Sequence, residues 1–484
     1  MVALPKPSGW NIRGIRLEVC RHYIGRTRPR LDHQLDAFLL PSALRSEKGG
    51  ARAHRSPPLF KADDLSTSSE ISNSTIFQHT LDNGLTVLAE PMPWLRTAAA
   101  YMKVPAGAHW ETDQHAGLAE VVAEMVQRGA GSRSSREMVT WLENRGIQYQ
   151  SFVGSHFTTM GAAMPAESLP DGLSLVADIF LRPHLPADQL PDAKAMAMQE
   201  LLALEDEPSQ LLMERLRWLH FGPYWGRSSY GSKPGIEAIT PALVRHFYER
   251  FYNPQQAVLV VAGNFSWPGT LQQITDLFAR WPRTTLPEPA PPPHEPAAYE
   301  HIQQDSAQTH IGFAFPAVDY AAEDYFALRA GIGVLSDGMS SRLFDRVREQ
   351  RGLCYSVSAS CYSAPKIGGV FGYAGTTAQR AQETLDVTLA EIIGLAEGVE
   401  AEELRRLKVR VQSDLIMQQE SCVSRAGSMA SDWVLLGRVR SATELEQRIE
   451  AITETDIVRY WREHPPRDFR IVTLGPEPLR VPVS

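Results

Sequence analysis

Apolar and polar residues alternate along this chain with two different periods, and the periods distinguish strands from helices. Residues 77–91, FQHTLDNGLTVLAEP, place apolar runs on either side of an Asp-Asn-Gly turn sequence and therefore predict a β-hairpin. The apolar run AAAYMKVPAG at 98–107 predicts a further strand. Longer segments with an apolar residue at every third or fourth position predict helices, as in QLLMERLRWLHF at 210–221.

One segment of this pattern occurs twice. IEAITPALVRHF at 236–247 returns as IEAITETDIVRYW at 449–461, offset by 213 positions. Each copy predicts a helix that is entered through Thr240 or Thr453 and is followed by an apolar strand. An internal duplication explains the recurrence. Because strands and helices are mixed rather than strictly alternating, we expect an α+β fold of two homologous halves, each a largely antiparallel sheet covered by helices.

A proline-rich stretch divides the two halves. In LPEPAPPPHEP, residues 286–296, closely spaced prolines exclude a helix and favour an extended connector. We therefore expect a linker at 286–298, an N-terminal domain at 76–285 and a C-terminal domain at 299–484.

Residues 1–75 form a leader of different composition. Its first 62 residues contain 12 Lys and Arg against 4 Asp and Glu, without the apolar core typical of a secretory signal. We expect a disordered tail or sequence translated from an upstream start, with an organelle transit peptide as the alternative. Whether the leader is translated or cleaved stays open.

Composition excludes several classes of protein. The chain is 43% hydrophobic and 21% charged, and no apolar run approaches the roughly 18 residues of a membrane-spanning helix. A net charge of -8 argues against a nucleic-acid binder. The four cysteines match neither a zinc knuckle nor a dense disulfide framework. We therefore expect reduced thiols and a cytoplasmic location, with the periplasm and the mitochondrial matrix left open.

The segment GLAEVVAEM at 117–125 combines a helical apolar pattern with two glutamates. Since an α-helix has about 3.6 residues per turn, Glu120 and Glu124 lie on one face. Such a pair suits a catalytic site, the remnant of one, or simply a solvated surface helix. The surrounding sequence decides among the three.

Most of the chain resembles the M16 metallopeptidases, the family of pitrilysin, insulinase and the mitochondrial processing peptidase. The resemblance covers about residues 76–478 and implies a LuxS/MPP-like fold built from two homologous halves. Its marks are DNGLTVL at 82–88, GAHWETDQHAGLAEVVAEM at 107–125, YNPQQAVLVVAGNF at 252–265 and GMSSRLFDRVREQRGLCYSV at 338–357.

Active members of that family carry His-x-x-Glu-His, in which two histidines hold Zn²⁺ and the glutamate takes a proton from the metal-bound water. This chain has Glu120, Ala123 and Glu124 at those positions, and Glu200 stands where the family has its third ligand. The resemblance therefore implies a degenerate zinc motif that lacks its general base. We expect neither a catalytic residue nor bound metal in this chain, although an all-carboxylate set leaves a harder cation open. Three clustered carboxylates should raise one pKa or recruit a basic neighbour such as Arg128.

Four histidines of the first half do not replace the lost motif. None has a second histidine four positions away on a predicted helix, so we expect ordinary exposed or hydrogen-bonded side chains. They are His109, His115, His156 and His184.

Arg348 and Tyr355 match a second family feature, an arginine followed seven residues later by a tyrosine that holds the peptide substrate near the metal. A guanidinium can donate two hydrogen bonds to a carbonyl or carboxylate, and a phenol can donate to a developing oxyanion. The alternative is that Arg348 pairs with a nearby carboxylate while Tyr355 merely begins a half-buried strand.

A chain without the metal-binding residues but with the substrate-holding pair resembles the non-catalytic subunit of a bacterial two-chain M16 peptidase. The resemblance implies a heterodimer with a His-x-x-Glu-His-bearing homologue, zinc in that partner, and a peptide substrate. The mitochondrial enzyme's non-catalytic chain instead uses a glycine-rich loop, whereas residues 330–344 here are not strongly glycine-rich. Two alternatives remain: a structural protein, like the core subunits of respiratory complexes, and a peptidase with atypical carboxylate ligands. Whether the chain is an enzyme by itself is open, and the substrate and partner cannot be identified from the sequence.

Overall fold

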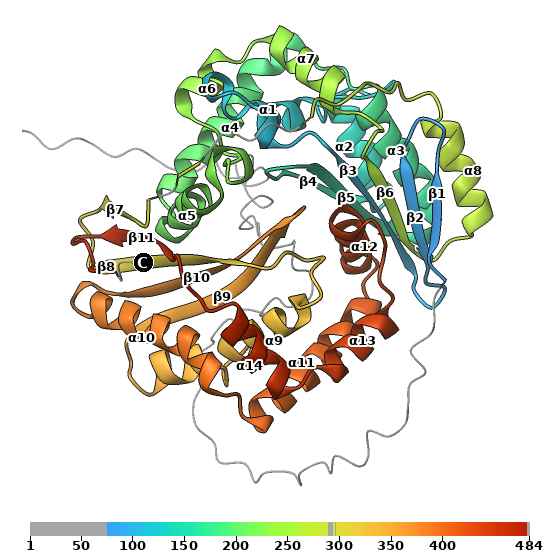
Figure 1. Ribbon diagram of the computed structural model, residues 1–484. Helices are drawn as coiled ribbons and strands as arrows, with labels where there is room; N and C mark the ends of the chain where they lie inside the picture. The colour runs from blue at the N-terminus through green and yellow to red at the C-terminus, as the bar shows by residue number, and fades with distance from the viewer. Residues whose placement is uncertain (1–74, 289–293, 296, 482–484) are drawn as a thin grey trace, which may run out of the picture. The chain divides into compact units, whose positions relative to one another are not determined.

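The computed structural model describes residues 75–288, 294–295 and 297–481. The predicted leader lies outside the described residues except for Thr75, and so do residues 289–293 and 296 of the predicted linker. The described residues form two β-sheets with their helices, and they confirm the α+β fold with two similar halves (Figure 1).

The first sheet has six strands in the order β1-β2-β6-β3-β5-β4, and all neighbours are antiparallel except β2 and β6. The predicted hairpin is confirmed as β1 and β2. The strands are β1 Phe77–Thr80, β2 Thr86–Pro91, β3 Thr97–Val104, β4 Gln148–Val153, β5 Thr158–Pro165 and β6 Val258–Gly263. The α-helices are α1 Leu118–Met125, α2 Ser135–Glu143, α3 Leu169–Leu181, α4 Leu190–Glu205, α5 Pro208–Trp225, α6 Lys233–Ala238, α7 Pro241–Phe251 and α8 Trp267–Phe278.

The second sheet has five strands in the order β7-β11-β8-β10-β9, again antiparallel except for one pair, β7 and β11. The strands are β7 Tyr299–Gln303, β8 Gln308–Ala317, β9 Cys354–Ala364, β10 Ile367–Thr377 and β11 Arg470–Gly475. The α-helices are α9 Tyr325–Ser336, α10 Ala381–Ile393, α11 Ala401–Gln419, α12 Cys422–Leu436, α13 Ala442–Ala451 and α14 Glu454–Glu463, and a π-helix spans Leu343–Glu349.

The duplicated segments occupy equivalent places in the two halves. The first copy forms the end of α6 and α7 before β6, and the second forms the end of α13 and α14 before β11. Thr240 and Thr453 cap α7 and α14 as predicted, because each hydroxyl accepts a hydrogen bond from the backbone N–H three residues later. The strand after each copy is the one that makes the parallel pair, with β2 or with β7. The repeat therefore extends from sequence to topology.

Helix α12, which lies late in the sequence, covers a face of the first sheet. Its Ala426 and Met429 are fully buried against a cluster that includes Tyr101 of β3 and Val260 of β6. Ala99 and Tyr101 of β3 face this helix, whereas alternate residues of the same strand face the other core of the half, as the period of a strand requires.

Helix α5 has the reciprocal position on the second sheet. Leu212 and Leu216 pack against Ala314 of β8 and Val472 of β11. Gly312 permits this close approach, because a Cβ atom there would lie 2.3 Å from Leu212 Cδ2. Each half thus contributes one helix to the sheet of the other.

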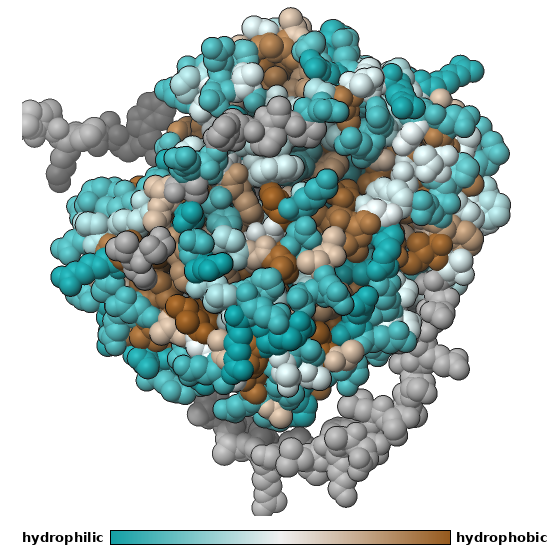
Figure 2. Space-filling view, in the orientation of Figure 1, coloured by the Kyte–Doolittle hydropathy of each residue, from teal (hydrophilic) through white to brown (hydrophobic). Residues whose placement is uncertain are grey.

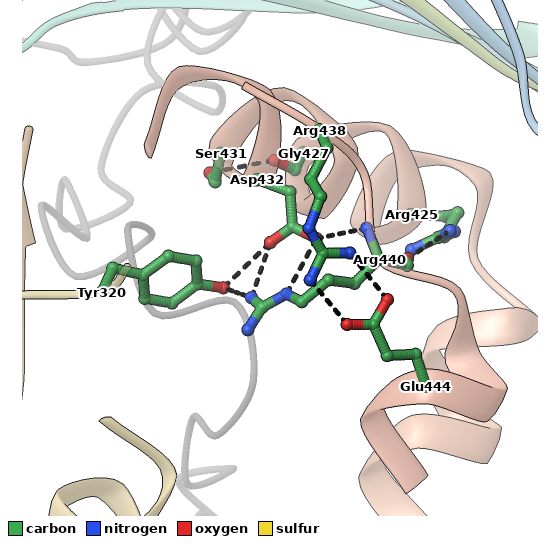
Figure 3. A network of polar contacts seen from close by, with 8 residues as sticks. All are labelled: Tyr320, Arg425, Gly427, Ser431, Asp432, Arg438, Arg440 and Glu444. Carbon is green, nitrogen blue, oxygen red and sulfur yellow. Dashed lines mark hydrogen bonds and ion pairs between the residues drawn. The ribbon is translucent and has the colours of Figure 1, made fainter. Parts of the chain in front are cut away.

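Buried ion pairs hold α12 in place (Figure 3). Asp432 Oδ1 lies 2.6 Å from Arg440 Nη2, and the side chains are 1% and 4% exposed. Tyr320 donates a hydrogen bond of 3.0 Å to the same carboxylate. Nearer the start of α12, Arg425 Nε lies 2.5 Å from Glu90 Oε2 of β2. These contacts connect α12 both to its own half and to the first sheet.

Hydrophilic residues predominate on the face drawn in Figure 2, with hydrophobic residues in smaller groups among them. Within the described ranges, no helix combines the length and apolar character needed to cross a bilayer. Cys354, Cys361 and Cys422 are buried and form no disulfide among the described residues, while Cys20 lies outside them.

Candidate functional site

Helix α1, which carries Glu120, Ala123 and Glu124, is almost entirely buried. Only Glu124 is partly accessible, while Glu120 is 8% and Ala123 is 3% exposed. The helix begins after Gly117, whose φ of 102° lies in the left-handed region. The solvated surface helix is therefore wrong for Glu120, whose carboxylate lies inside the fold.

Glu111 caps the start of α1. Its two carboxylate oxygens accept hydrogen bonds from the backbone N–H groups of Gly117, at 2.9 Å, and Ala119, at 2.7 Å. A carboxyl group at this position accepts hydrogen bonds from N–H groups that have no partner within the helix. Sequence analysis did not single out Glu111. Its place a few residues before a helix was the available signal.

Arg128, the basic neighbour named in the sequence, pairs with Glu124. Its Nη2 lies 3.1 Å from Glu124 Oε1, one helical turn away, and its Nη1 lies 3.9 Å from Asp192 of α4. Glu200 projects from the same α4, which packs against α1. The predicted recruitment of Arg128 is confirmed, and this guanidinium supplies positive charge directly beside Glu124.

Arg348 lies on the π-helix between two aromatic rings. Its guanidinium carbon is 4.5 Å from the centroid of Phe344 and 5.4 Å from that of Tyr355. Its Nε is also 3.5 Å from Glu349, but both side chains of that pair are partly exposed, at 35% and 57%. Exposed ion pairs contribute about 0–1 kcal/mol and exposed cation–π contacts about 0.5–1 kcal/mol each, so the two rings hold the guanidinium at least as much as Glu349 does. π-Helical turns of this kind occur often at functional sites.

Tyr355 is the extra residue of a β-bulge. Cys354 pairs with Thr376 and Ser356 pairs with Gly375, which leaves Tyr355 without a partner residue in β10. Cys354 is 8% exposed in the core, whereas Tyr355 is 84% exposed. The strand predicted from residue 355 is confirmed as β9. The bulge presents the Tyr355 ring to solvent beside Arg348, so the structure brings the two predicted residues into contact.

A cluster of histidines and aromatic residues next to Glu111 is a feature that sequence analysis missed. The rings of His109 and His156 are 5.0 Å apart, and they pack against Tyr224 and Trp225 at the end of α5. His109 Nδ1 is hydrogen-bonded to the carbonyl oxygen of Ser155 at 2.7 Å. No spacing rule links positions this far apart in the chain, so the sequence offered no signal for the cluster.

The four histidines discussed in the sequence differ in detail. His109, His115 and His184 are hydrogen-bonded, as predicted. His156 departs from the prediction in one respect, because its Nε2 is buried without a hydrogen-bond partner.

A pocket of about 400 Å³ opens beside this cluster of histidines and aromatic residues. Its lining is His109, Trp110, Glu111, Pro223, Tyr224, Arg227, Arg250, Phe251, Pro287 and Glu288.

Burial shifts the pKa values of this cluster in opposite directions for acids and bases. It lowers the pKa of His109 to about 4 and that of His156 to about 3, the latter with help from the charges of His109 and Lys103. Burial raises the pKa of Glu111 to about 8, against the opposing effect of its two backbone donors and Arg227. Both imidazoles are therefore neutral at pH 7.

These shifts predict acid sensitivity. In the unfolded chain His156 binds a proton below about pH 6.5, but in the folded protein it does so only near pH 3. Its contribution to stability is thus present above pH 6.5 and is lost as the pH falls toward 3.

We expect His156→Phe to lose less stability than the parent between pH 7 and pH 4.5, measured as the change in urea denaturation midpoint. Because Glu111 acts in the opposite direction, the comparison is between variant and parent at each pH. The exposed His246, replaced by Gln, is the control and should follow the parent.

Family profiles match both halves of the chain. The profile described as "Insulinase (Peptidase family M16)" matches residues 86–221, and that described as "Peptidase M16 inactive domain" matches residues 238–410. The chain belongs to the M16 peptidase family. The resemblance to this family that was drawn from the sequence is confirmed.

Several relatives of this M16 chain are named zinc proteases. The "uncharacterized zinc protease YmxG" of Bacillus subtilis (strain 168) is 24% identical over 405 residues, which cover 83% of this chain and 98% of the relative. An "uncharacterized zinc protease" of Rickettsia bellii (strain RML369-C) is 25% identical over 387 residues, covering 78% of this chain and 92% of the relative.

Solved M16 structures share the fold. The peptidase M16 inactive domain from Pseudomonas fluorescens superposes with a TM-score of 0.76 at 21% identity, covering 84% of this chain and 100% of that one. A protease from Helicobacter pylori gives a TM-score of 0.76 at 17% identity over 83% of this chain. At these identities the likeness concerns the fold.

The residues at the metal positions of this M16 chain do not fit zinc. Glu120 and Glu124 replace the imidazoles that zinc prefers, and Ala123 cannot accept a proton. Glu124 is engaged by the Arg128 guanidinium. Among the described residues, the only three His, Cys, Asp or Glu side chains whose ligand atoms all lie within 4.8 Å of one another are Asp324, Glu463 and His464, far along the chain from α1.

Proposed function

We propose that this chain is the non-catalytic, substrate-binding subunit of a heterodimeric zinc metallopeptidase that processes peptides. In this proposal the partner is an M16 homologue with an intact His-x-x-Glu-His motif, which holds the zinc and its water. This chain contributes Arg348 and Tyr355, which hold the peptide against the partner's metal. It has no metal and no catalytic residue of its own.

The observation that carries the proposal is the contrast between two parts of the chain. The guanidinium of Arg348 is fixed against Phe344 and Tyr355, and a bulge presents the Tyr355 ring outward. Helix α1, by contrast, is buried and has Arg128 bound to Glu124. A purely structural role gives no reason for an exposed tyrosine on a bulge beside a stacked arginine. A peptidase with carboxylate ligands has no general base at Ala123.

Zinc binding and heterodimer formation can be tested in one set of experiments. We expect the purified chain to bind no stoichiometric zinc and to cleave no peptide, because imidazoles and base are absent. Coexpressed with an M16 homologue bearing His-x-x-Glu-His from the same genome, it should form a one-to-one complex that contains one zinc and cleaves peptides. The interface should exceed the roughly 1,600 Å² of a standard complex, since four homologous domains must enclose the peptide. Metal analysis, size-exclusion chromatography and a fluorogenic peptide assay give the three readouts.

A restored motif serves as the control for the metal result. Glu120→His, Ala123→Glu and Glu124→His together should recover zinc binding before activity, because the sequence already has Glu200 at the position of the third ligand, whereas activity also depends on the hydrogen bonds that orient the ligands. Tight zinc and chelator-sensitive hydrolysis by the unmodified chain alone would favour the peptidase with atypical ligands. A chain that stays monomeric at micromolar concentration in the presence of the candidate partner would count against the proposed heterodimer.

A further inference from the structure

Gly375 of β10 lies between two polar residues of the neighbouring strands. The sheet register pairs it with His310 of β8 on one side and with Ser356 of β9 on the other. Ser356 is the residue directly after Tyr355. The side chain of Tyr373, two positions earlier in β10 and so on the same face, lies across this glycine.

The hydroxyl of Tyr373 connects the three strands. It lies 2.7 Å from His310 Nδ1, and both it and Ser356 Oγ border the space beside Gly375. A Cβ atom on Gly375 would lie 2.8 Å from this hydroxyl and 3.3 Å from Ser356 Oγ, so only glycine leaves room for the bridge. We call Tyr373, His310 and Ser356 the three-strand bridge.

The direction of the hydrogen bonds in the three-strand bridge follows from the protonation states. Burial lowers the pKa of His310, so its ring is neutral at pH 7 and can accept at Nδ1. Burial raises the pKa of Tyr373, so its hydroxyl stays protonated at pH 7 and can donate. Tyr373 therefore donates to His310, and Ser356 Oγ lies beside the same hydroxyl across Gly375.

The strand needs this support at the bulge. β9 lies at the edge of the sheet, and β10 is the only strand of the described residues that pairs with it. The bulge interrupts that remaining ladder at Tyr355. On one side of Tyr355 the backbone is held by Cys354, which is buried in the core. On the other side the three-strand bridge holds Ser356.

We propose that Tyr373 is a positioning residue for Tyr355: by tying Ser356 to β8 across Gly375, it fixes the bulge and aims the Tyr355 ring. The inference rests on the proposed function, because the orientation of the Tyr355 ring affects the reaction only if Tyr355 acts on the peptide. Tyr373 touches no substrate in this proposal, and its effect reaches the reaction only through Tyr355.

The kinetic test uses Tyr373→Phe in the heterodimer described above. Misplacing a reacting group by about 1 Å can cost on the order of 10²-fold in rate. Because the substituted phenylalanine keeps the ring and loses only the hydroxyl, we expect kcat to fall about 10-fold while KM changes little. Because Tyr373 acts through Tyr355, the double variant Tyr355→Phe/Tyr373→Phe should be no slower than Tyr355→Phe alone. Additive losses, or an unchanged kcat for Tyr373→Phe, would overturn the inference.

Tyr299→Phe is the matched control. Tyr299 lies in β7 at the opposite edge of the same sheet, and its hydroxyl also makes two hydrogen bonds, with Thr473 Oγ1 at 2.8 Å and with the Leu479 N–H at 2.7 Å. The same atom is removed and a similar network is lost. We expect the thermal stability to fall as in Tyr373→Phe but kcat to stay at the parent value. An equal loss of kcat in both variants would show a general effect of sheet stability and contradict the inference.

A second measurement separates this inference from the proposed function. With 3-fluorotyrosine placed at position 355, the ¹⁹F signal of the chain alone reports the environment and order of that ring. We expect Tyr373→Phe, or Ser356→Ala if that variant does not fold, to shift or broaden the signal, and Tyr299→Phe to leave it unchanged. An unaltered signal in both bridge variants refutes the positioning role. If the signal changes but Tyr355→Phe has normal turnover in the heterodimer, the proposed function fails and the positioning of Tyr355 stands.

Discussion

Arg348→Ala and Tyr355→Phe are each expected to lower kcat of the heterodimer by about 10²–10³, the loss typical of one donor to a developing charge. The guanidinium and the phenol lie next to each other and are already ordered by ring contacts, so little rearrangement is needed to bind the peptide. The complex should still assemble and still contain one zinc, because neither side chain is buried in a core. Steady-state kinetics on the purified heterodimer, together with its metal content, measure both parts.

Arg346→Ala is the matched control for the arginine. Arg346 lies on the same π-helix with a similar exposed fraction, 38% against 35% for Arg348, but it pairs with Glu391 at 2.8 Å. We expect kcat to change less than twofold, within the ~0–1 kcal/mol scale of a partly exposed ion pair. Glu124→Gln should also leave turnover nearly unchanged. If substitution of Arg348 and Tyr355 left turnover unchanged while substitution of Glu120 or Glu124 abolished it, the functional site would be on α1 and the proposed function would be wrong.

Arg440→Ala is expected to destabilise the chain by about 3–5 kcal/mol, because it leaves the carboxylate of Asp432 buried without its charge partner. Asp432 is 1% exposed and accepts two bonds from the guanidinium and one from the backbone N–H of Arg440 (Figure 3). Asp432 lies on α12, which covers one face of the first sheet, so the substitution should destabilise both halves. Urea denaturation followed by circular dichroism gives the change in the free energy of unfolding.

The neighbouring pair provides an internal comparison. Arg438 and Glu444 are joined at 2.7 Å, about the same distance, but their side chains are 55% and 29% exposed. Arg438→Ala should therefore cost only about 0–1 kcal/mol. Replacing Asp432 and Arg440 together by Leu and Met should restore much of the stability lost in Arg440→Ala, since no charge is then buried alone. Equal losses for Arg440→Ala and Arg438→Ala would contradict the role of burial.

Local patterns in the chain predicted much of the fold. The hairpin of β1 and β2 lies within residues 77–91, each capping threonine bonds to a residue three positions later, and each copy of the recurrence is one continuous segment that leads into β6 or β11. At this range, hydrogen-bonding geometry and side-chain period decide the structure with little help from elsewhere. The exchange of α5 and α12 between the two sheets was not predicted, because it joins segments more than 90 residues apart.

In the candidate site, too, some features could be predicted from the sequence and others could not. The identities of Glu120, Ala123 and Glu124 follow from the chain alone, as does the seven-residue spacing of Arg348 and Tyr355. Their surroundings do not. Sequence analysis left a solvated α1 open, and burial excluded it for Glu120.

The sequence by itself determined the chemistry available to this protein: which positions of the M16 motif lack imidazole and base, and which arginine and tyrosine remain. Only the tertiary structure decided how those groups are held. The bulge that exposes Tyr355, the Phe344 ring under Arg348 and the three-strand bridge each depend on the register of strands or the packing of helices. Register and packing are chosen by the whole core, because moving one strand by a single residue turns every side chain to the other face. A local pattern therefore names the functional groups, while the long-range contacts fix where they point.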